Sequence, residues 1–360
     1  MLLPSRVTGE GLPWIASAFY RNAEAIQVFV VVESDMPRFL PVPTVELPLD
    51  QCVLFATSVV RELGPVQSLD FLRVPDVFCR CMNLSQGLLD IFEGGAREAL
   101  GDPLLGIFTL DIPGGIDPDP NRDALFGAII AAALMGRMFE PVYDPASQTP
   151  FTVYNASPDN EKRLRQAGLH FFASGEKVGF HTDGSIDEKT VSVPEYIGLY
   201  NLLINYQKPG NLYWLPFSLW EEFDAYAERF GWAVPYRIEL TPAVYSNADE
   251  TIIFATRSVQ APIFSRSNER QAIVFFNGRI LGRERFNGQD IDQLVAEMGQ
   301  SISLNPVRYC IPQRQRRLVF ARNTCGFHAR DMLEKPYHGC KYTRSFIRAV
   351  SASGAQVGLC

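Results

Sequence analysis

The residues of this sequence that could do metal chemistry centre on the segment Gly179–Gly184, which contains His181 and Asp183. Residues two apart on an extended strand point to the same face, so this spacing would set an imidazole beside a carboxylate. Only four histidines occur in the chain: His170, His181, His328 and His338. We expect His328 to supply the third ligand. Two histidines and one carboxylate, with other positions open, are typical of non-haem Fe(II) sites that activate oxygen.

A second pattern of charged residues lies near the C-terminus, in Tyr342–Val350. On a strand, Arg344 and Arg348 would face the same side, together with Phe346. Two guanidinium groups on such a face are unusual for a core, but they suit binding of a carboxylate through paired hydrogen bonds. An iron site that uses a 2-oxo-acid co-substrate would need such an anion site on a strand that follows His328.

The same part of the chain offers a rival metal site. Its four candidate ligands are of types that structural zinc accepts: Cys325, His328, His338 and Cys340. The spacing of Cys325 and His328 suits zinc, but His338-x-Cys340 is tight for two ligands from one strand. A zinc site would also leave His181-x-Asp183 unexplained. Iron is therefore favoured, and a non-catalytic, zinc-stabilised binding protein and a fold with a silent triad stay as alternatives.

The elements that must position these residues change in character along the chain. Helical periodicity covers about 49–63, 75–100 and 122–138, with later helices at about 218–230 and 290–298. Strand patterns occur at 26–32, 104–111, 169–173, 179–183, 198–206, 236–240, 251–256, 272–276, 317–321 and 342–350. Helices followed by many strands predict a mostly β domain with helical decoration. We expect one domain over 1–360, with helical support in 1–138 and a β core in 139–360.

Composition narrows the class of protein further. The net charge of −7 argues against nucleic acid, which calls for a basic surface. The most apolar run, Phe126–Gly136, is too short to cross a bilayer and predicts a buried helix. Seven cysteines without a secretory signal predict reduced thiols in a cytoplasmic protein. Cys79 and Cys81 are expected to be incidental helix residues.

Three motifs together resemble a known enzyme superfamily. They are Phe180-His-Thr-Asp183, the segment Arg322-Asn-Thr-Cys-Gly-Phe-His-Ala-Arg330, and Tyr337-His-Gly followed by Arg344-x3-Arg348. The sequence resembles the clavaminate-synthase-like and taurine-dioxygenase-like Fe(II)/2-oxoglutarate-dependent oxygenases, and among them the amino-acid hydroxylases of peptide-antibiotic biosynthesis. The resemblance implies a double-stranded β-helix (jelly-roll, cupin-like) core. It also implies that His181, Asp183 and His328 bind iron and that Arg344, with Arg348 beside it, binds the distal carboxylate of 2-oxoglutarate.

The resemblance further implies hydroxylation of an unactivated C–H bond by O2, with release of succinate and CO2. The expected substrate is a free or carrier-bound amino acid, or a similar small carboxylic acid. Because Asp183 fills the carboxylate position, chloride has no vacant site and halogenation is disfavoured, whereas desaturation and cyclisation stay open. Gln148 and Arg279 are the candidate substrate-binding residues, and loops 139–160 and 184–195 are candidate lids.

Overall fold

The computed structural model describes residues 37–144, 148–166, 173–186, 189–240, 243–245, 252–254, 256–267, 271–277, 279–281 and 290–358. Pro37–Cys360 forms one compact unit. The strands expected at 26–32 and over most of 169–173 lie outside the described residues, as does His170. Among the helices described, none combines the length and the apolarity needed to cross a membrane.

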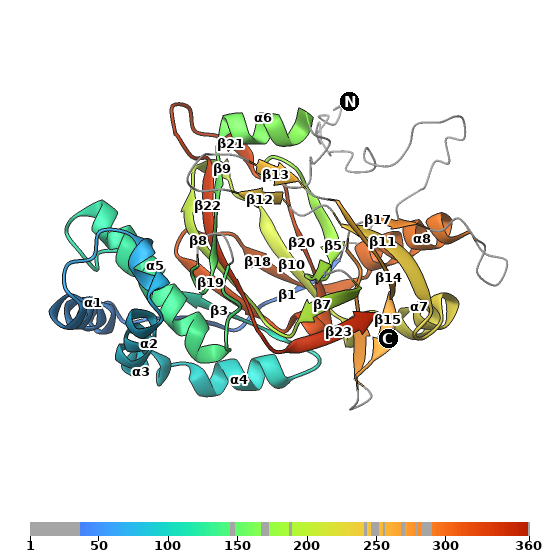
Figure 1. Ribbon diagram of the computed structural model, residues 1–360, viewed down its shortest axis with the longest axis horizontal. Helices are drawn as coiled ribbons and strands as arrows, with labels where there is room; N and C mark the ends of the chain where they lie inside the picture. The colour runs from blue at the N-terminus through green and yellow to red at the C-terminus, as the bar shows by residue number, and fades with distance from the viewer. Residues whose placement is uncertain are drawn as a thin grey trace, which may run out of the picture. The chain divides into compact units, whose positions relative to one another are not determined.

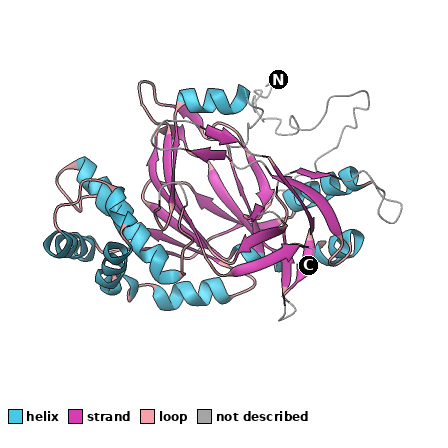
Figure 2. Ribbon diagram, in the orientation of Figure 1, coloured by secondary structure: helices cyan, strands magenta, loops and turns pink. Residues whose placement is uncertain are grey.

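Helices occupy much of the first third of the described chain and recur singly later (Figures 1 and 2). They are α1 (Leu49–Leu63), α2 (Pro75–Leu84), α3 (Gln86–Leu89), α4 (Glu93–Gly101), α5 (Pro120–Met138), α6 (Pro158–Gln166), α7 (Phe223–Phe230) and α8 (Ile291–Leu304). Short 3-10 turns cover Leu69–Arg73, Phe217–Leu219 and Asn323–Cys325. Cys79 and Cys81 both lie on α2, and the six cysteines that the structure describes are unpaired.

The single helix expected over 75–100 is wrong, because the chain breaks into α2, α3 and α4 there. The last break lies at Phe92, whose backbone leaves the helical conformation at φ −132° before α4 begins. The break lets the Phe92 ring turn inward, where it stacks on Phe108 and Phe320 of the neighbouring sheet. Burial of one aromatic ring thus outweighs the continuity of the helix.

Two large sheets form the centre of the unit. The six-stranded sheet has the order β2 (Thr44–Glu46), β3 (Ile107–Asp111), β19 (Arg317–Ala321), β8 (Ile197–Ile204), β22 (Arg344–Val350), β4 (Thr152–Ala156). The five-stranded sheet has the order β1 (Arg38–Leu40), β18 (Val307–Pro312), β10 (Asn211–Pro216), β20 (Gly326–Arg330), β5 (Val178–His181). The neighbouring strands are antiparallel except for the pairs β1/β18 and β2/β3. The sheet-rich core expected from the sequence is confirmed, although helices take up about as much of the described chain as strands do.

Smaller sheets surround this pair. They contain β6 (Ser185–Ile186), β7 (Thr190–Pro194) and β23 (Gly354–Gly358); β9 (Tyr206–Lys208) and β21 (Glu334–Pro336); β11 (Pro235–Leu240), β14 (Arg257–Pro262) and β17 (Arg279–Leu281); β12 (Ala243–Tyr245) and β13 (Ile252–Phe254); β15 (Phe264–Arg266) and β16 (Ala272–Val274). The two expected lid loops are therefore partly ordered structure. Loop 139–160 contains β4 and the start of α6, and loop 184–195 contains β6 and β7.

Side chains between the two large sheets form a small apolar cluster to which both sheets contribute. Val319 and Ile197 come from the six-stranded sheet, and Trp214 and Ile311 come from the five-stranded sheet. The outer face of the five-stranded sheet packs differently, since Leu215 and Phe327 join the cluster formed with α7 and α8. Successive residues of β10 and β20 thus face opposite sides, as the period of a strand requires.

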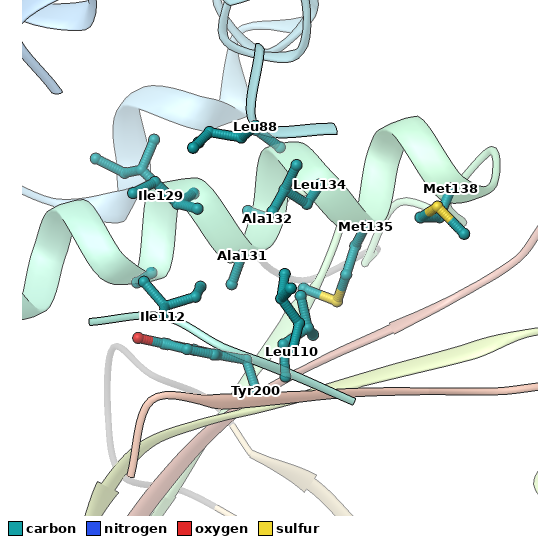
Figure 3. Packing of buried hydrophobic residues seen from close by; sticks show 14 of the residues in the cluster. Leu88, Leu110, Ile112, Ile129, Ala131, Ala132, Leu134, Met135, Met138 and Tyr200 are labelled. Atoms are coloured by element: carbon teal, nitrogen blue, oxygen red, sulfur yellow. The ribbon is translucent and has the colours of Figure 1, made fainter. Parts of the chain in front are cut away.

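Helix α5 covers the outer face of the six-stranded sheet (Figure 3). Its residues from Phe126 to Met135 are all buried, because the sheet lies on one side of the helix and α2 and α3 lie on the other. A helix that is apolar on every side needs such a setting. The buried helix expected over Phe126–Gly136 is confirmed.

Stability should depend on this helix. Leu134 is fully buried on α5, whereas Leu54 on α1 is 58% exposed. We expect Leu134→Ala to lower the free energy of unfolding by about 2–5 kcal/mol, because it leaves a cavity between the helix and its neighbours. Leu54→Ala, the matched control, should change it by less than about 0.5 kcal/mol. Urea unfolding would measure both, and equal losses would contradict this packing.

Candidate metal centre

The two histidines of the predicted triad face each other on neighbouring strands. His181 ends β5, and His328 lies in the middle of β20, directly opposite it in the antiparallel register. Their ring centroids are 4.1 Å apart. None of the strands expected from the sequence contains His328. The structure instead gives it a strand of its own, separated from β19 by the turn at Asn323–Cys325.

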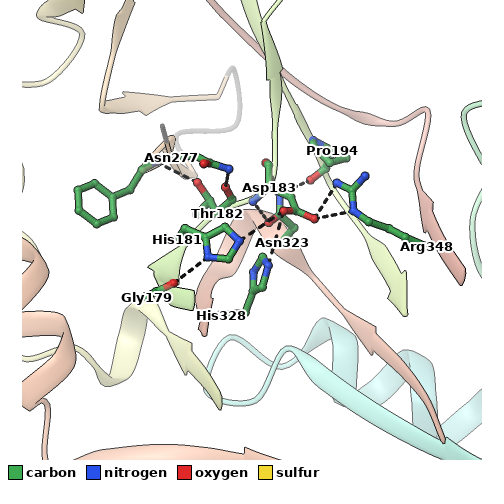
Figure 4. Close-up of polar contacts among 10 residues, drawn as sticks. Gly179, His181, Thr182, Asp183, Pro194, Asn277, Asn323, His328 and Arg348 are labelled. Carbon is green, nitrogen blue, oxygen red and sulfur yellow. Dashed lines mark hydrogen bonds and ion pairs between the residues drawn. The ribbon is translucent and has the colours of Figure 1, made fainter. Parts of the chain in front are cut away.

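Asp183 completes the group from just beyond the end of β5. Its Oδ1 lies 3.7 Å from His181 Nε2 and 3.6 Å from His328 Nε2. All three donor atoms lie within 4.8 Å of one another, and no other group of three such residues gathers within the described chain. In Figure 4 the Asp183 carboxylate lies between the two imidazole rings on one side and Arg348 on the other.

The protonation states of His181 and Asp183 are those that a metal ion requires. Burial and the neighbouring His328 lower the pKa of His181 to about 4, so its ring is neutral at pH 7. Burial alone would raise the pKa of the Asp183 carboxyl. The charge of Arg348 and the two histidines together outweigh burial, and the pKa lies well below its usual range. Metal binding needs neutral imidazoles and an ionised carboxylate.

Hydrogen bonding also fixes which nitrogen of His181 faces Asp183. His181 Nδ1 lies 2.9 Å from the Gly179 carbonyl oxygen, which can only accept, so Nδ1 carries the proton. The lone pair of Nε2 then faces the negative Oδ1 of Asp183, an arrangement that is repulsive without a cation. On the other ring, His328 Nδ1 is buried without a hydrogen-bond partner.

This donor set fits a single divalent transition metal. A cation about 2.1 Å from each donor can touch atoms up to about 4.2 Å apart, and the Nε2–Oδ1 distances of 3.7 and 3.6 Å fall below that limit. Two neutral nitrogens and one anionic oxygen are the ligands of the facial triad of Fe(II). The residues present therefore fit the metal that the sequence predicts.

The two predicted anion-binding arginines have different environments. The burial of β22 alternates as expected, with Ile347 and Ala349 packed toward α5 and the arginines on the other face. Arg348 donates from Nε and Nη2 to Asp183 Oδ2, at 3.0 and 2.7 Å. Asp183 raises the pKa of Arg348 above its usual value despite burial, so the pair is ionic. Arg348 is therefore bound to the carboxylate of the triad.

Arg344, by contrast, has no carboxylate within ion-pair distance among the described residues. Its Nη2 donates to two neutral amide oxygens, Asn201 Oδ1 at 3.2 Å and Gln313 Oε1 at 3.0 Å, and its buried Nε has no partner. Burial and the neighbouring Arg330 lower its pKa to about 9. A cavity of about 20 Å³, lined by residues of both large sheets, lies beside Arg344.

The rival zinc ligands do not gather. Of the four, only His328 belongs to a group of three potential ligands within the described chain. The Cys325 thiol is turned toward Gly106 and Trp214, and burial raises its pKa to about 12, so it is not a thiolate at neutral pH. His338 is exposed. The zinc site considered from the sequence is therefore wrong.

Of the two candidate substrate residues, the structure describes Gln148 and only the backbone of Arg279. Gln148 is exposed, and its N–H donates to the Asp144 carbonyl oxygen in a turn. The backbone of Arg279 begins β17, and its side chain is outside what the structure describes. Their roles stay predictions.

Two residues beside the triad were not predicted from the sequence to have a role in the site. The Asn323 side chain binds the backbone of Asp183, and Tyr154 forms a hydrogen bond with Arg348 while its ring stacks on Phe346 at 4.8 Å. Asn323 lies five residues before His328 inside a motif that the sequence analysis quoted. Tyr154 follows a proline-rich loop, and no local pattern marks it.

Comparison with known proteins supports the fold. No protein-family model and no curated protein matches the sequence. Among solved structures, an asparagine oxygenase in complex with Fe(II), 2S,3S-3-hydroxyasparagine and succinate matches with a TM-score of 0.55 and 13% identity, over 86% of this chain and 93% of that chain. The non-heme iron oxygenase OrfP in complex with Fe matches with a TM-score of 0.53 and 12% identity, over 86% and 93%. Its complex with Fe and alpha-ketoglutaric acid gives 0.53 and 14%, over 86% and 93%. The chain has the fold of these non-heme iron oxygenases.

The Asp183–Arg348 contact can be tested in the metal-free protein. We expect Arg348→Gln to lower the free energy of unfolding by up to about 3–5 kcal/mol, because it leaves the charge of Asp183 buried and alone. In a double-mutant cycle with Asp183→Asn, the coupling energy should be about 1–3 kcal/mol. The exposed pair Arg237–Glu239, also in contact at 2.9 Å, is the matched control, with an expected coupling below about 1 kcal/mol. Additive losses at Asp183 and Arg348 would contradict a coupled buried pair.

Proposed function

We propose that this protein is an Fe(II)/2-oxoglutarate-dependent oxygenase that hydroxylates a C–H bond of an amino acid or a similar small carboxylic acid. The observation that carries the proposal is the convergence of His181, Asp183 and His328 in the fold of non-heme iron oxygenases. The two histidines reach the site from neighbouring strands, which are rigid supports suited to a catalytic metal.

Each residue of the triad has a defined part in this proposal. His181 and His328 would bind iron through Nε2, and Asp183 would bind it through Oδ1. Arg348 occupies Asp183 Oδ2 from two donor atoms, which favours binding of the metal by a single carboxylate oxygen and leaves its other positions open. When bound, the iron would supply the oxidising power for hydroxylation, with 2-oxoglutarate and O2 as co-substrates and succinate and CO2 as products.

Arg344 would bind the distal carboxylate of 2-oxoglutarate. A buried guanidinium without a carboxylate partner is costly, and an incoming anion would compensate it. Arg348 is less suited to this role because Asp183 already uses it. Arg344 lies four residues from Arg348 on β22, which is about 13 Å along a strand, within the combined reach of an arginine side chain and a five-carbon diacid.

The strand order supports the double-stranded β-helix that the resemblance implies. Between β5 and β22 the chain passes repeatedly from one large sheet to the other. β5 and β10 belong to the five-stranded sheet and β8 to the six-stranded sheet, while β19, β20 and β22 alternate between the two. We propose that these strands form the jelly-roll core, with the metal centre between the sheets.

The substrate class follows the similar structures. One is an asparagine oxygenase bound to 3-hydroxyasparagine, and OrfP has been solved in complex with (3S)-hydroxy-L-Arg and with L-canavanine. Segment 275–279 of this chain carries no acidic residue that could hold a cationic side chain, which argues against arginine. We propose a free or carrier-bound amino acid or a similar small carboxylic acid, with Gln148 and Arg279 as candidate contacts. The cytoplasmic location expected from the reduced thiols stays a prediction.

The metal assignment has a direct spectroscopic test. Anaerobic addition of Fe(II) and 2-oxoglutarate to the metal-free protein should give a weak visible charge-transfer band that needs both additions. Asp183→Ala should abolish the band because the iron loses its anionic ligand, and Cys325→Ser should keep it. A wild-type protein without this band, or a Cys325→Ser protein that loses it, would contradict the iron site.

Binding of the co-substrate has its own variant. Arg344→Leu should weaken 2-oxoglutarate binding roughly ten- to a hundredfold, the loss expected for a charge-assisted contact of about 1.5–3 kcal/mol. Iron binding measured without 2-oxoglutarate should not change. Arg314→Leu removes an arginine whose side chain is 63% exposed and serves as the matched control. Equal 2-oxoglutarate affinity in both variants would show that another residue binds the distal carboxylate of 2-oxoglutarate.

A further inference from the structure

We propose that Asn323 is a positioning residue of the metal centre, which holds the backbone of Asp183 so that its carboxylate faces both histidines. The inference rests on the proposed metal site. It concerns a side chain that does not touch the metal donor atoms and acts through Asp183.

The contacts of Asn323 use every polar group of its side chain. Asn323 is fully buried. Its Oδ1 accepts the N–H of Asp183 at 2.7 Å, and its Nδ2 donates to the carbonyl oxygens of Asp183 and Pro194, both at 2.9 Å. One amide side chain therefore holds both backbone polar groups of the same residue, as Figure 4 shows.

Asp183 needs this support because it lies outside the strand ladder. Strand β5 ends at His181, and its pairing with β20 is already irregular there. In an antiparallel pair, a residue exchanges N–H and C=O bonds with its partner strand. The Asn323 amide makes the same two bonds to Asp183 and so replaces the missing strand.

The neighbouring contacts show that the backbone of Asp183 depends on Asn323 in particular. Thr182 is held separately by the segment Phe276–Asn277, through its backbone N–H, its hydroxyl and its carbonyl. Arg348 holds the carboxylate of Asp183 but not its backbone. Among the described residues, Asn323 alone hydrogen-bonds the main chain of Asp183.

The position of Asn323 in the chain gives these bonds a further consequence. Asn323 opens the turn that leads into β20, and His328 follows five residues later. The side chain therefore ties the loop of the second ligand to the segment of the third ligand. Its bond to Pro194 fixes the end of β7 to the same point. The relative placement of Asp183 and His328 is thus set before any metal arrives, which is how supporting residues raise metal affinity.

The test uses Co(II) in place of iron, because its visible absorption reports ligand geometry without turnover. Asn323→Asp keeps the shape of the side chain, but it replaces the Nδ2 donor with an oxygen that faces two carbonyl oxygens. Asn323→Ser is the second variant and retains one hydroxyl. We expect Asn323→Asp to weaken Co(II) binding ten- to a hundredfold and to alter the absorption spectrum, with a smaller loss in Asn323→Ser.

Asn305→Asp is the matched control, since Asn305 is also buried and its Nδ2 donates to a carbonyl oxygen, that of Val307, at 2.6 Å. It should bind Co(II) as the wild-type protein does. Circular dichroism would verify that each variant folds. If Asn323→Asp does not fold, the Co(II) affinity and spectrum of Asn323→Ser test the inference. A folded Asn323 variant with wild-type Co(II) affinity and spectrum would overturn the inference alone. If the wild-type protein binds no Co(II), or if a variant without the His181 imidazole still binds it, the proposed metal site is overturned as well.

Discussion

The ion pair between Asp183 and Arg348 is the interaction on which the candidate metal centre between the two large sheets depends. Asp183 follows β5 of the five-stranded sheet, and Arg348 belongs to β22 of the six-stranded sheet. The pair therefore joins the two sheets through charge at a point where both side chains are largely shielded from water. Together with the two histidines, Arg348 offsets the effect of burial and holds the pKa of the Asp183 carboxyl well below its usual range, so the carboxyl is ionised.

Stability alone does not explain such a pair. Removing two charges from water often costs as much as their attraction returns, so apolar residues of similar size would serve the fold equally well. The same interior also holds Arg344 without a carboxylate partner, and a neutral His181 whose lone pair faces a negative oxygen. These features are unfavourable in an unliganded core. They become favourable together if a cation binds at Asp183 and an anion binds at Arg344, which is the pairing that an iron and 2-oxoglutarate site requires.

The sequence predicted the parts of this site that a strand's period of two controls. The alternation of Arg344 and Arg348 with Ile347 and Ala349 follows from that rule, whereas Asp183 lies beyond the end of β5, so its approach to His181 does not. The separate strand for His328 was missed. Gly326–Arg330 is short, and all five residues are buried because one face packs on α7 and α8 while the other carries His328 toward His181 and Asp183. With both faces buried, β20 shows no alternation.

The contact between Asn323 and Asp183 could not follow from any local pattern, because it joins residues 140 positions apart. Its existence nevertheless has a physical reason that starts from the sequence. A carboxylate two residues after His181 must leave the strand to approach both imidazoles, and its backbone polar groups then need partners inside a buried loop. An asparagine amide offers a donor and an acceptor at the spacing of a peptide group. Asn323 holds the main chain of Asp183, and Arg348 orients its carboxylate. Together the two residues place the Asp183 oxygen that faces both imidazoles.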